Sequence, residues 1–297
     1  MMRLCYKEVV LKDGEGTLRT VKSRSLAAFF LELETFGNMV ALQHTTYGIA
    51  PRLPVEIEEI IFVLTVKSCP SSWVTLVRVA KRVQTWMEPY QYQVLTDSNL
   101  SPGYDLKKHG GRVRSVLLRS LITAEARQTI ECCPNVTNIA LWLPCSPKGL
   151  LSNLPHRLPL THLSGDIEAL FESDWPPFEL PILQDVTHLE VTGPLCDWQK
   201  WEGIDQLPEL SHLSVAGEYS DHIILHLLES LPNLKALIVQ SGAVRDFDPL
   251  NSPDIPSDAR LTFRVITDSY NEWFASANGR ESFWDRVETD RLVDFSD

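Results

Sequence analysis

Apolar side chains recur in a six-residue pattern through the second half of the chain. The pattern is close to apolar-x-x-apolar-x-apolar, and successive copies begin 23, 24, 26, 24 and 24 residues apart. The six copies are Val113–Leu118, Val136–Leu141, Leu160–Gly165, Val186–Val191, Leu210–Val215 and Leu234–Val239. A strand and a return segment at this period predict stacked units that together bury one continuous apolar column.

Flanking segments support this interpretation. Leu207-Pro208-Glu209 and Leu231-Pro232-Asn233 precede their strands at the same offset. Asp221–Leu231 gathers its apolar residues on one face, which predicts a helix between two strands. The alternation at Leu261–Val265 predicts a final strand, and Tyr270–Val293 carries an aromatic helical face. We expect this last segment to cap the open end of the stack.

Amphipathic helices are predicted ahead of the repeats. Pro54 suits a first helical turn, and the apolar stripe that follows it contains Ile57, Ile60, Ile61 and Leu64. Apolar positions from Trp73 to Met87 continue the helical period until Pro89, which we expect to interrupt it. Together these segments predict a small helical module.

Turn-forming residues are concentrated at 97–111, where we place a boundary. Before the helical module, a hairpin is expected around Asp13–Gly16 and a short helix at Leu26–Phe36. The expected fold class is α/β: a short helical module followed by an irregular solenoid, with parallel strands on its concave face and helices or loops on its convex face. The expected division is an N-terminal extension at 1–48, the module at 49–97, the repeat region at 98–268, and a helical cap with an acidic tail at 269–297.

Composition is that of an ordinary globular protein, with 44% hydrophobic and 22% charged residues. The net charge of −12 argues against general nucleic-acid binding. It is unevenly spread, because residues 1–120 carry 16 basic and 11 acidic side chains and residues 121–297 carry 11 and 28. The acidic part would steer basic ligands, although such a surface also serves solubility. We expect no secretory signal, no membrane span, and reduced thiols for the six cysteines, hence a cytoplasmic or nuclear protein.

Two features in combination resemble a known family. Leu53-Pro54-x-Glu56-Ile57, the apolar helix after it, and Val79-Ala80-Lys81-Arg82 with Trp86 resemble an F-box. The repeats that follow are similar to leucine-rich repeats, although the usual Asn after the strand is missing. This order, with Trp273, Gly279 and Phe283-Trp284 near the end, is similar to F-box proteins of basidiomycete fungi.

The resemblance implies a substrate-recognition subunit of a Skp-cullin-F-box ubiquitin ligase. Its partners would be the Skp-type adaptor, the cullin ligase and an unknown target protein. Carried over by position, the adaptor contacts are Leu53, Pro54, Ile57, Ile60 and Leu64. An apolar stripe on so short a unit cannot all turn inward, which independently favours a partner site. The long extension before the motif and a loop with Cys69-Pro70 but no acidic residues depart from the family.

The repeat strands also predict a polar surface. Residues beside the middle apolar position of each copy should face the concave side, and three of them are histidines at equivalent positions. Such a ladder could bind a divalent metal or sense pH, or simply be a polar exposed row. The target-binding candidates are Asn138, Trp142, His162, Ser164, His188, Glu190, His212 and Ser214.

Known catalytic motifs do not occur in the sequence. Gly-x-Ser-x-Gly, His-Glu-x-x-His and Gly-x-Gly-x-x-Gly are absent, and the adjacent Cys132 and Cys133 lack zinc-ligand spacing. We therefore expect no enzymatic activity, no metal and no cofactor. Two alternatives stay open: a repeat scaffold without ligase association, and an enzyme on an unfamiliar α/β scaffold, which would need a deep pocket with converging titratable groups.

Overall fold

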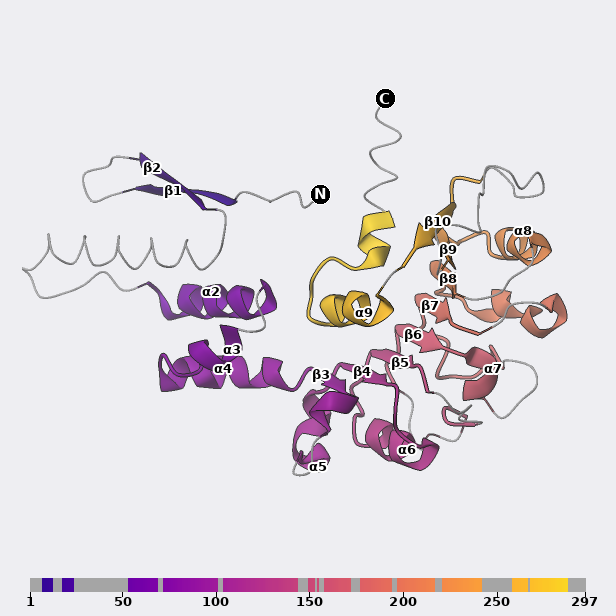
Figure 1. Cartoon of the computed structure of the whole chain (residues 1–297), viewed down its shortest axis with the longest axis horizontal. Helices are drawn as coiled ribbons and strands as arrows, with labels where there is room; N and C mark the ends of the chain where they lie inside the picture. Colours follow the sequence, from indigo (N-terminus) through magenta and orange to yellow (C-terminus); the bar gives the residue numbers. More distant parts are fainter. Residues whose placement is uncertain are drawn as a thin grey trace, which may run out of the picture. The chain divides into compact units, whose positions relative to one another are not determined.

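The computed structural model (Figure 1) divides the chain into two compact units, Met1–Trp86 and Met87–Asp297. Described residues are 7–12, 18–23, 53–68, 72–100, 104–143, 149–152, 154, 158–171, 177–193, 197–216, 221–241, 258–266 and 268–287. The short helix expected at Leu26–Phe36 lies outside these residues. Among the described helices, none combines the length and apolar character needed to cross a membrane.

The first unit contains the predicted hairpin and the predicted helices. Strands β1 (Lys7–Lys12) and β2 (Leu18–Ser23) pair antiparallel, and helices α2 (Val55–Ser68) and α3 (Trp73–Leu76) follow, together with the first part of α4 (Lys81–Gln91), which continues past the unit boundary at Trp86. The Arg82 guanidinium on α4 donates two hydrogen bonds to the Glu58 carboxylate on α2, at 3.0 and 3.1 Å. The expected interruption at Pro89 is wrong. This proline lies in the last turn of α4, where its missing N–H removes a single helical bond.

The second unit is an α/β structure with eight parallel strands that neighbour one another in chain order. All seven strand pairs are parallel, which is consistent with a solenoid. The strands are β3 (Val94–Thr96), β4 (Ser115–Leu118), β5 (Asn138–Leu141), β6 (His162–Gly165), β7 (His188–Val191), β8 (His212–Ala216), β9 (Ala236–Ser241) and β10 (Leu261–Val265). Six of them, β4 to β9, coincide with the six apolar patterns, and β10 is the predicted final strand.

The sheet begins earlier than the sequence boundary at 97 implied. Strand β3 pairs with β4, so residues 94–96 belong with the repeats rather than with the helical module. The expected turn region is also partly helical, with η2 (Asp97–Asn99), α5 (Leu106–His109) and η3 (Gly110–Arg112). Strand β3 escaped detection because three residues are too few to show a period.

Alternation along each strand divides the sheet into two faces. Leu163, Leu189 and Leu213 point into the main apolar core, which helices α6 (Thr123–Glu131), α7 (Ile167–Leu170) and α8 (Asp221–Ser230) cover. The short segments 198–201 (η4) and 204–206 (η5) lie between β7 and β8. We call the opposite side, which carries the residue after each of these leucines, the concave face.

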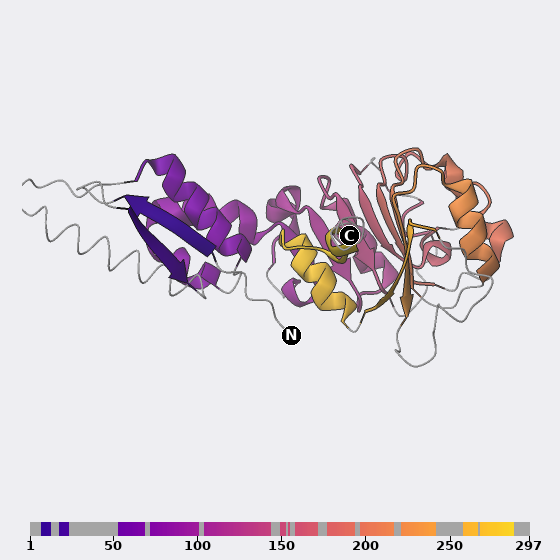
Figure 2. The same ribbon diagram turned by 90° about the horizontal axis from the view of Figure 1, so that it is seen from above.

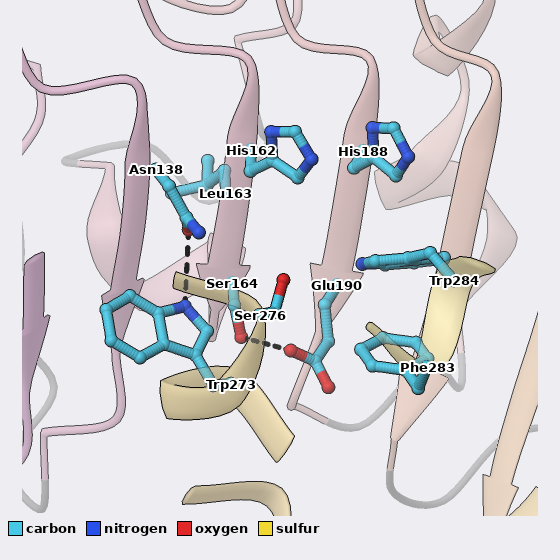
Figure 3. A pocket seen from close by; sticks show the side chains of 10 residues that line it. All are labelled: Asn138, His162, Leu163, Ser164, His188, Glu190, Trp273, Ser276, Phe283 and Trp284. Carbon is cyan, nitrogen blue, oxygen red and sulfur yellow. Dashed lines mark hydrogen bonds between the residues drawn. The ribbon is translucent and has the colours of Figure 1, made fainter. Parts of the chain in front are cut away.

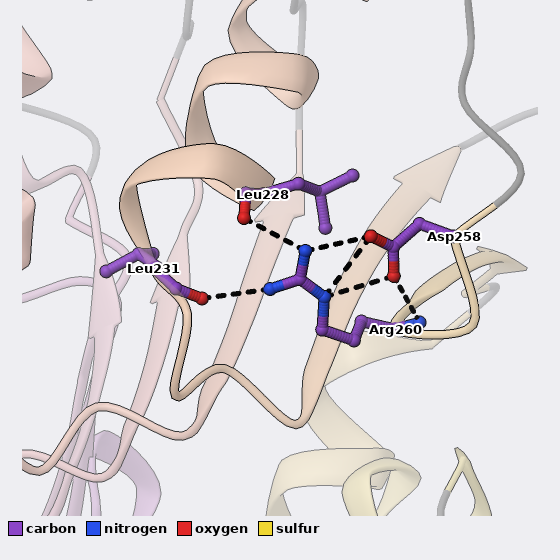
Figure 4. Close-up of polar contacts among 4 residues, drawn as sticks. All are labelled: Leu228, Leu231, Asp258 and Arg260. Carbon is purple, nitrogen blue, oxygen red and sulfur yellow. Dashed lines mark hydrogen bonds and ion pairs between the residues drawn. The ribbon is translucent and has the colours of Figure 1, made fainter.

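Arg260 joins the last strand to the preceding helix (Figure 4). Its guanidinium donates to the backbone carbonyl of Leu228, in the last turn of α8, at 2.9 Å, and to that of Leu231, the residue after α8, at 3.0 Å. The same group is held by the Asp258 carboxylate at 2.8 to 3.3 Å. Because the last carbonyls of a helix have no partner within the helix, this arginine acts as a C-terminal cap supplied by the residue that immediately precedes β10.

The C-terminal segment, residues 268–287, does not cap the open end of the stack as expected. Its helix α9 (Ser269–Ala277) and a helical turn at 283–287 lie against the concave face, on the side of the sheet opposite α6, α7 and α8 (Figures 1 and 2). Trp273 packs with Leu117 and Ala140 of that face, and Phe283 and Trp284 pack with Ala236 and Ile238. Small or apolar side chains on the concave face therefore receive the aromatic side of the segment.

Candidate functional site

The predicted adaptor residues are all exposed. Exposed fractions are 55% for Leu53, 43% for Ile57, 52% for Ile60 and 57% for Leu64, and Pro54 is exposed as well. Among the described residues, nine large apolar side chains are exposed, and seven of these lie between residues 53 and 79. So strong a local concentration of exposed apolar side chains is typical of a surface that meets a partner.

The target-binding candidates lie together on the concave face, as their spacing predicted. Registers pair His162 with His188 and His188 with His212, one residue per strand. These side chains are not an open row, however, because the C-terminal segment lies over them. Ser164, Glu190, His212 and Ser214 are buried, whereas Asn138, Trp142, His162 and His188 are partly buried. The predicted exposed polar row is thus a covered one.

The three histidines form a stacked ladder. Ring centroids are 4.2 Å apart for His162 and His188 and 4.3 Å apart for His188 and His212, with planes within 8° of parallel. Trp284 meets His188 and His212 edge-on, at 5.2 and 5.8 Å. The ladder therefore forms one side of the contact that holds the C-terminal segment.

Hydroxyl groups fix the histidine tautomers. Nδ1 of His162, His188 and His212 lies 2.8 to 2.9 Å from the hydroxyl of the preceding residue, which is Thr161, Thr187 or Ser211. Each of these hydroxyls already donates its one proton to a backbone carbonyl of the previous repeat, at 3.1 to 3.2 Å. The hydroxyl oxygen must therefore accept from Nδ1–H, which leaves Nε2 as the acceptor nitrogen of each neutral ring.

The ladder favours neutral histidines and does not suit a shared metal ion. Burial, together with the smaller effects of the neighbouring imidazoles of His162 and His212, lowers the pKa of His188 to about 3. Burial lowers the pKa of His162 as well. Lone pairs on parallel rings run side by side, whereas metal ligands must converge on one point about 2 Å away. In the described part of the chain, no group of three His, Cys, Asp or Glu is placed to hold a metal.

A buried polar network lies next to the ladder. Ser164 Oγ–H donates to Glu190 at 2.5 Å, and the Gln240 amide donates to the other Glu190 oxygen at 2.7 Å and to Ser214 at 2.6 Å. Trp142 Nε1–H donates to Ser164 Oγ at 2.8 Å. Glu190 is only 6% exposed, and burial raises the pKa of its carboxyl, while the hydrogen bonds from Ser164 and Gln240 oppose that shift.

A small cavity separates this network from the C-terminal segment (Figure 3). Its volume is about 30 Å³. Figure 3 shows Glu190 between Trp273 on one side and Phe283 and Trp284 on the other. Trp273 is fixed by a hydrogen bond from its Nε1–H to Asn138 Oδ1 at 3.2 Å. The lining residues are Asn138, His162, Leu163, Ser164, His188, Glu190, Trp273, Ser276, Phe283 and Trp284.

Five of the eight target-binding candidates line this cavity, namely Asn138, His162, Ser164, His188 and Glu190. Sequence reasoning noticed Trp273, Phe283 and Trp284 as a helical aromatic face but did not assign them to the same site. The available signal was that face itself, whose apolar side had to be covered by something.

Comparisons with family models, curated proteins and solved structures find no match to this chain.

Proposed function

We propose that the chain is a non-catalytic substrate receptor of a Skp-cullin-F-box ubiquitin ligase, with an F-box-like module followed by a leucine-rich-repeat-like solenoid. The observation that carries the proposal is the exposed apolar stripe of Leu53, Ile57, Ile60 and Leu64. These side chains repeat at helical spacing along α2 and its entry, in the order that resembles an F-box. The receptor would act by proximity, raising the effective concentration of a bound target near the ubiquitin-carrying subunit.

The exposed stripe can supply part of the free energy of docking. Fully burying one Leu or Ile is worth roughly 1.5 to 3 kcal/mol, and about half of each side chain is still exposed. Four such side chains would therefore contribute roughly 4 kcal/mol on docking, before the entropic cost of association. Further exposed apolar residues nearby, Val55, Val74 and Val79, enlarge the available surface.

A binding assay tests this proposal directly. The purified full chain is passed over an immobilised Skp-type adaptor beside the double variant Leu53→Ala/Pro54→Ala. Ile122→Ala is the matched control, because Ile122 is equally exposed and apolar but lies in the second unit. Capture of the wild type and the control, but not of the double variant, is expected. If the adaptor retains none of the three proteins, the alternative of a repeat scaffold without ligase association replaces the proposal.

A further inference from the structure

The cavity beneath the C-terminal segment combines a buried carboxylate with aromatic walls. Glu190 is almost entirely buried, and its two hydrogen-bond donors, the Ser164 hydroxyl and the Gln240 amide, are both neutral. A buried carboxylate without a charged partner is costly, because two neutral hydrogen bonds replace only part of its hydration. A positively charged occupant beside Glu190 would offset this cost and oppose the rise in the carboxyl pKa that burial causes.

The opposite walls have the chemistry that such an occupant requires. Trp273, Phe283 and Trp284 line the same cavity, and aromatic rings attract a cation within about 6 Å of their centres. His162 and His188 complete the lining. Both rings have lowered pKa values, so they are neutral at pH 7 and do not repel a cation.

We propose that this cavity is a binding site for a primary ammonium group. The cavity volume of about 30 Å³ is enough for a group the size of a water molecule, and a primary ammonium, unlike a quaternary one, can donate N–H hydrogen bonds to the Glu190 carboxylate. Glu190 supplies the charge and the aromatic residues of the C-terminal segment supply the walls. The strongly acidic composition of residues 121–297 steers cations towards this part of the chain. The site uses no residue of the helical module and is independent of adaptor docking.

Tryptophan fluorescence of the full chain provides the test, because Trp273 and Trp284 border the site. Methylammonium chloride is titrated at constant ionic strength against potassium chloride, and tetramethylammonium chloride serves as a cation without an N–H donor. We expect a saturable change with methylammonium alone. Nα-acetyl-lysine methylamide then distinguishes two sources of the same group: its binding indicates a lysine side chain of a partner, whereas binding of methylammonium alone indicates a free amine.

Substitution of the carboxylate adds a second readout. Glu190→Gln keeps the shape of the side chain and removes its charge, which should weaken methylammonium binding roughly tenfold to a hundredfold. Glu125→Gln is the matched control, because Glu125 is an exposed carboxylate on α6. An unsaturable response in the wild type, or an equal response to tetramethylammonium, would overturn the proposal and assign the cavity to water. These wild-type results decide the question even if Glu190→Gln fails to fold.

Discussion

Replacing Trp284 by alanine should release the C-terminal segment from the concave face. The indole is 8% exposed, contacts two histidines of the ladder edge-on, and lies 4.3 Å from the Phe283 ring. An aromatic side chain buries about 200 Å², which at about 25 cal/mol per Å² gives an upper value of roughly 5 kcal/mol. Observed costs of Trp→Ala substitutions in cores are about 3 to 5 kcal/mol.

The segment can respond to this loss by local opening. It contributes helical turns rather than a strand, so it can leave the sheet without breaking any strand pair. If the free energy with which the segment docks is smaller than the cost of the substitution, the segment undocks completely while the sheet stays folded. We therefore expect faster amide hydrogen exchange across 268–287 in Trp284→Ala and little change in β6, β7 and β8.

Hydrogen exchange read by mass spectrometry measures this response segment by segment. Trp198→Ala is the matched control, because Trp198 is partly buried against the main core, away from the concave face, and stacks on His226 at 4.9 Å. That variant should leave exchange of 268–287 unchanged. Equal protection of the segment in Trp284→Ala and in the wild type would refute the reasoning, because the indole would then contribute nothing to docking.

Three further predictions concern the stability of the second unit, Met87–Asp297, each measured by urea unfolding of the full chain. Gly110→Ala should destabilise it by several kcal/mol, because the added Cβ would lie 1.9 Å from the Cys132 carbonyl oxygen, whereas Gly111→Ala meets nothing within 4 Å and should be neutral. Arg260→Lys should cost about 2 kcal/mol, since one ammonium cannot span the two helix-ending carbonyls and the carboxylate that the guanidinium joins. The free energy of unfolding should fall as the pH drops from 6.5 towards about 3. In this range the His188 imidazole takes up a proton only in the unfolded state, which lowers the free energy of unfolding by up to about 1.4 kcal/mol per pH unit. His188→Gln should reduce this slope; an unchanged slope would contradict the assignment.

Much of the repeat unit was predictable because its signals are local. Each apolar pattern marks a strand whose buried residues repeat within six positions, and the nearly constant spacing sets the register between strands. That register brings His162, His188 and His212 into one row. The apolar stripe from Leu53 to Leu64 was predictable for the same reason, since helical spacing depends only on neighbouring residues, whereas its exposure is a property of the folded unit.

Other features depend on contacts between distant parts of the chain. The aromatic face at Trp273, Phe283 and Trp284 indicates that something covers it, but an apolar face carries no information about which surface it meets. Likewise, the sequence alone indicates only that Glu190 is a polar position on a strand. Its burial depends on Gln240, which is 50 residues away in sequence, and on the C-terminal segment, which is farther away still. The sequence by itself determined the strands, their register and the amphipathic helices, because short-range periodicity encodes them. Only the tertiary structure decided that the C-terminal segment lies on the concave face and forms a cavity there, because burial is a property of surfaces that meet in space.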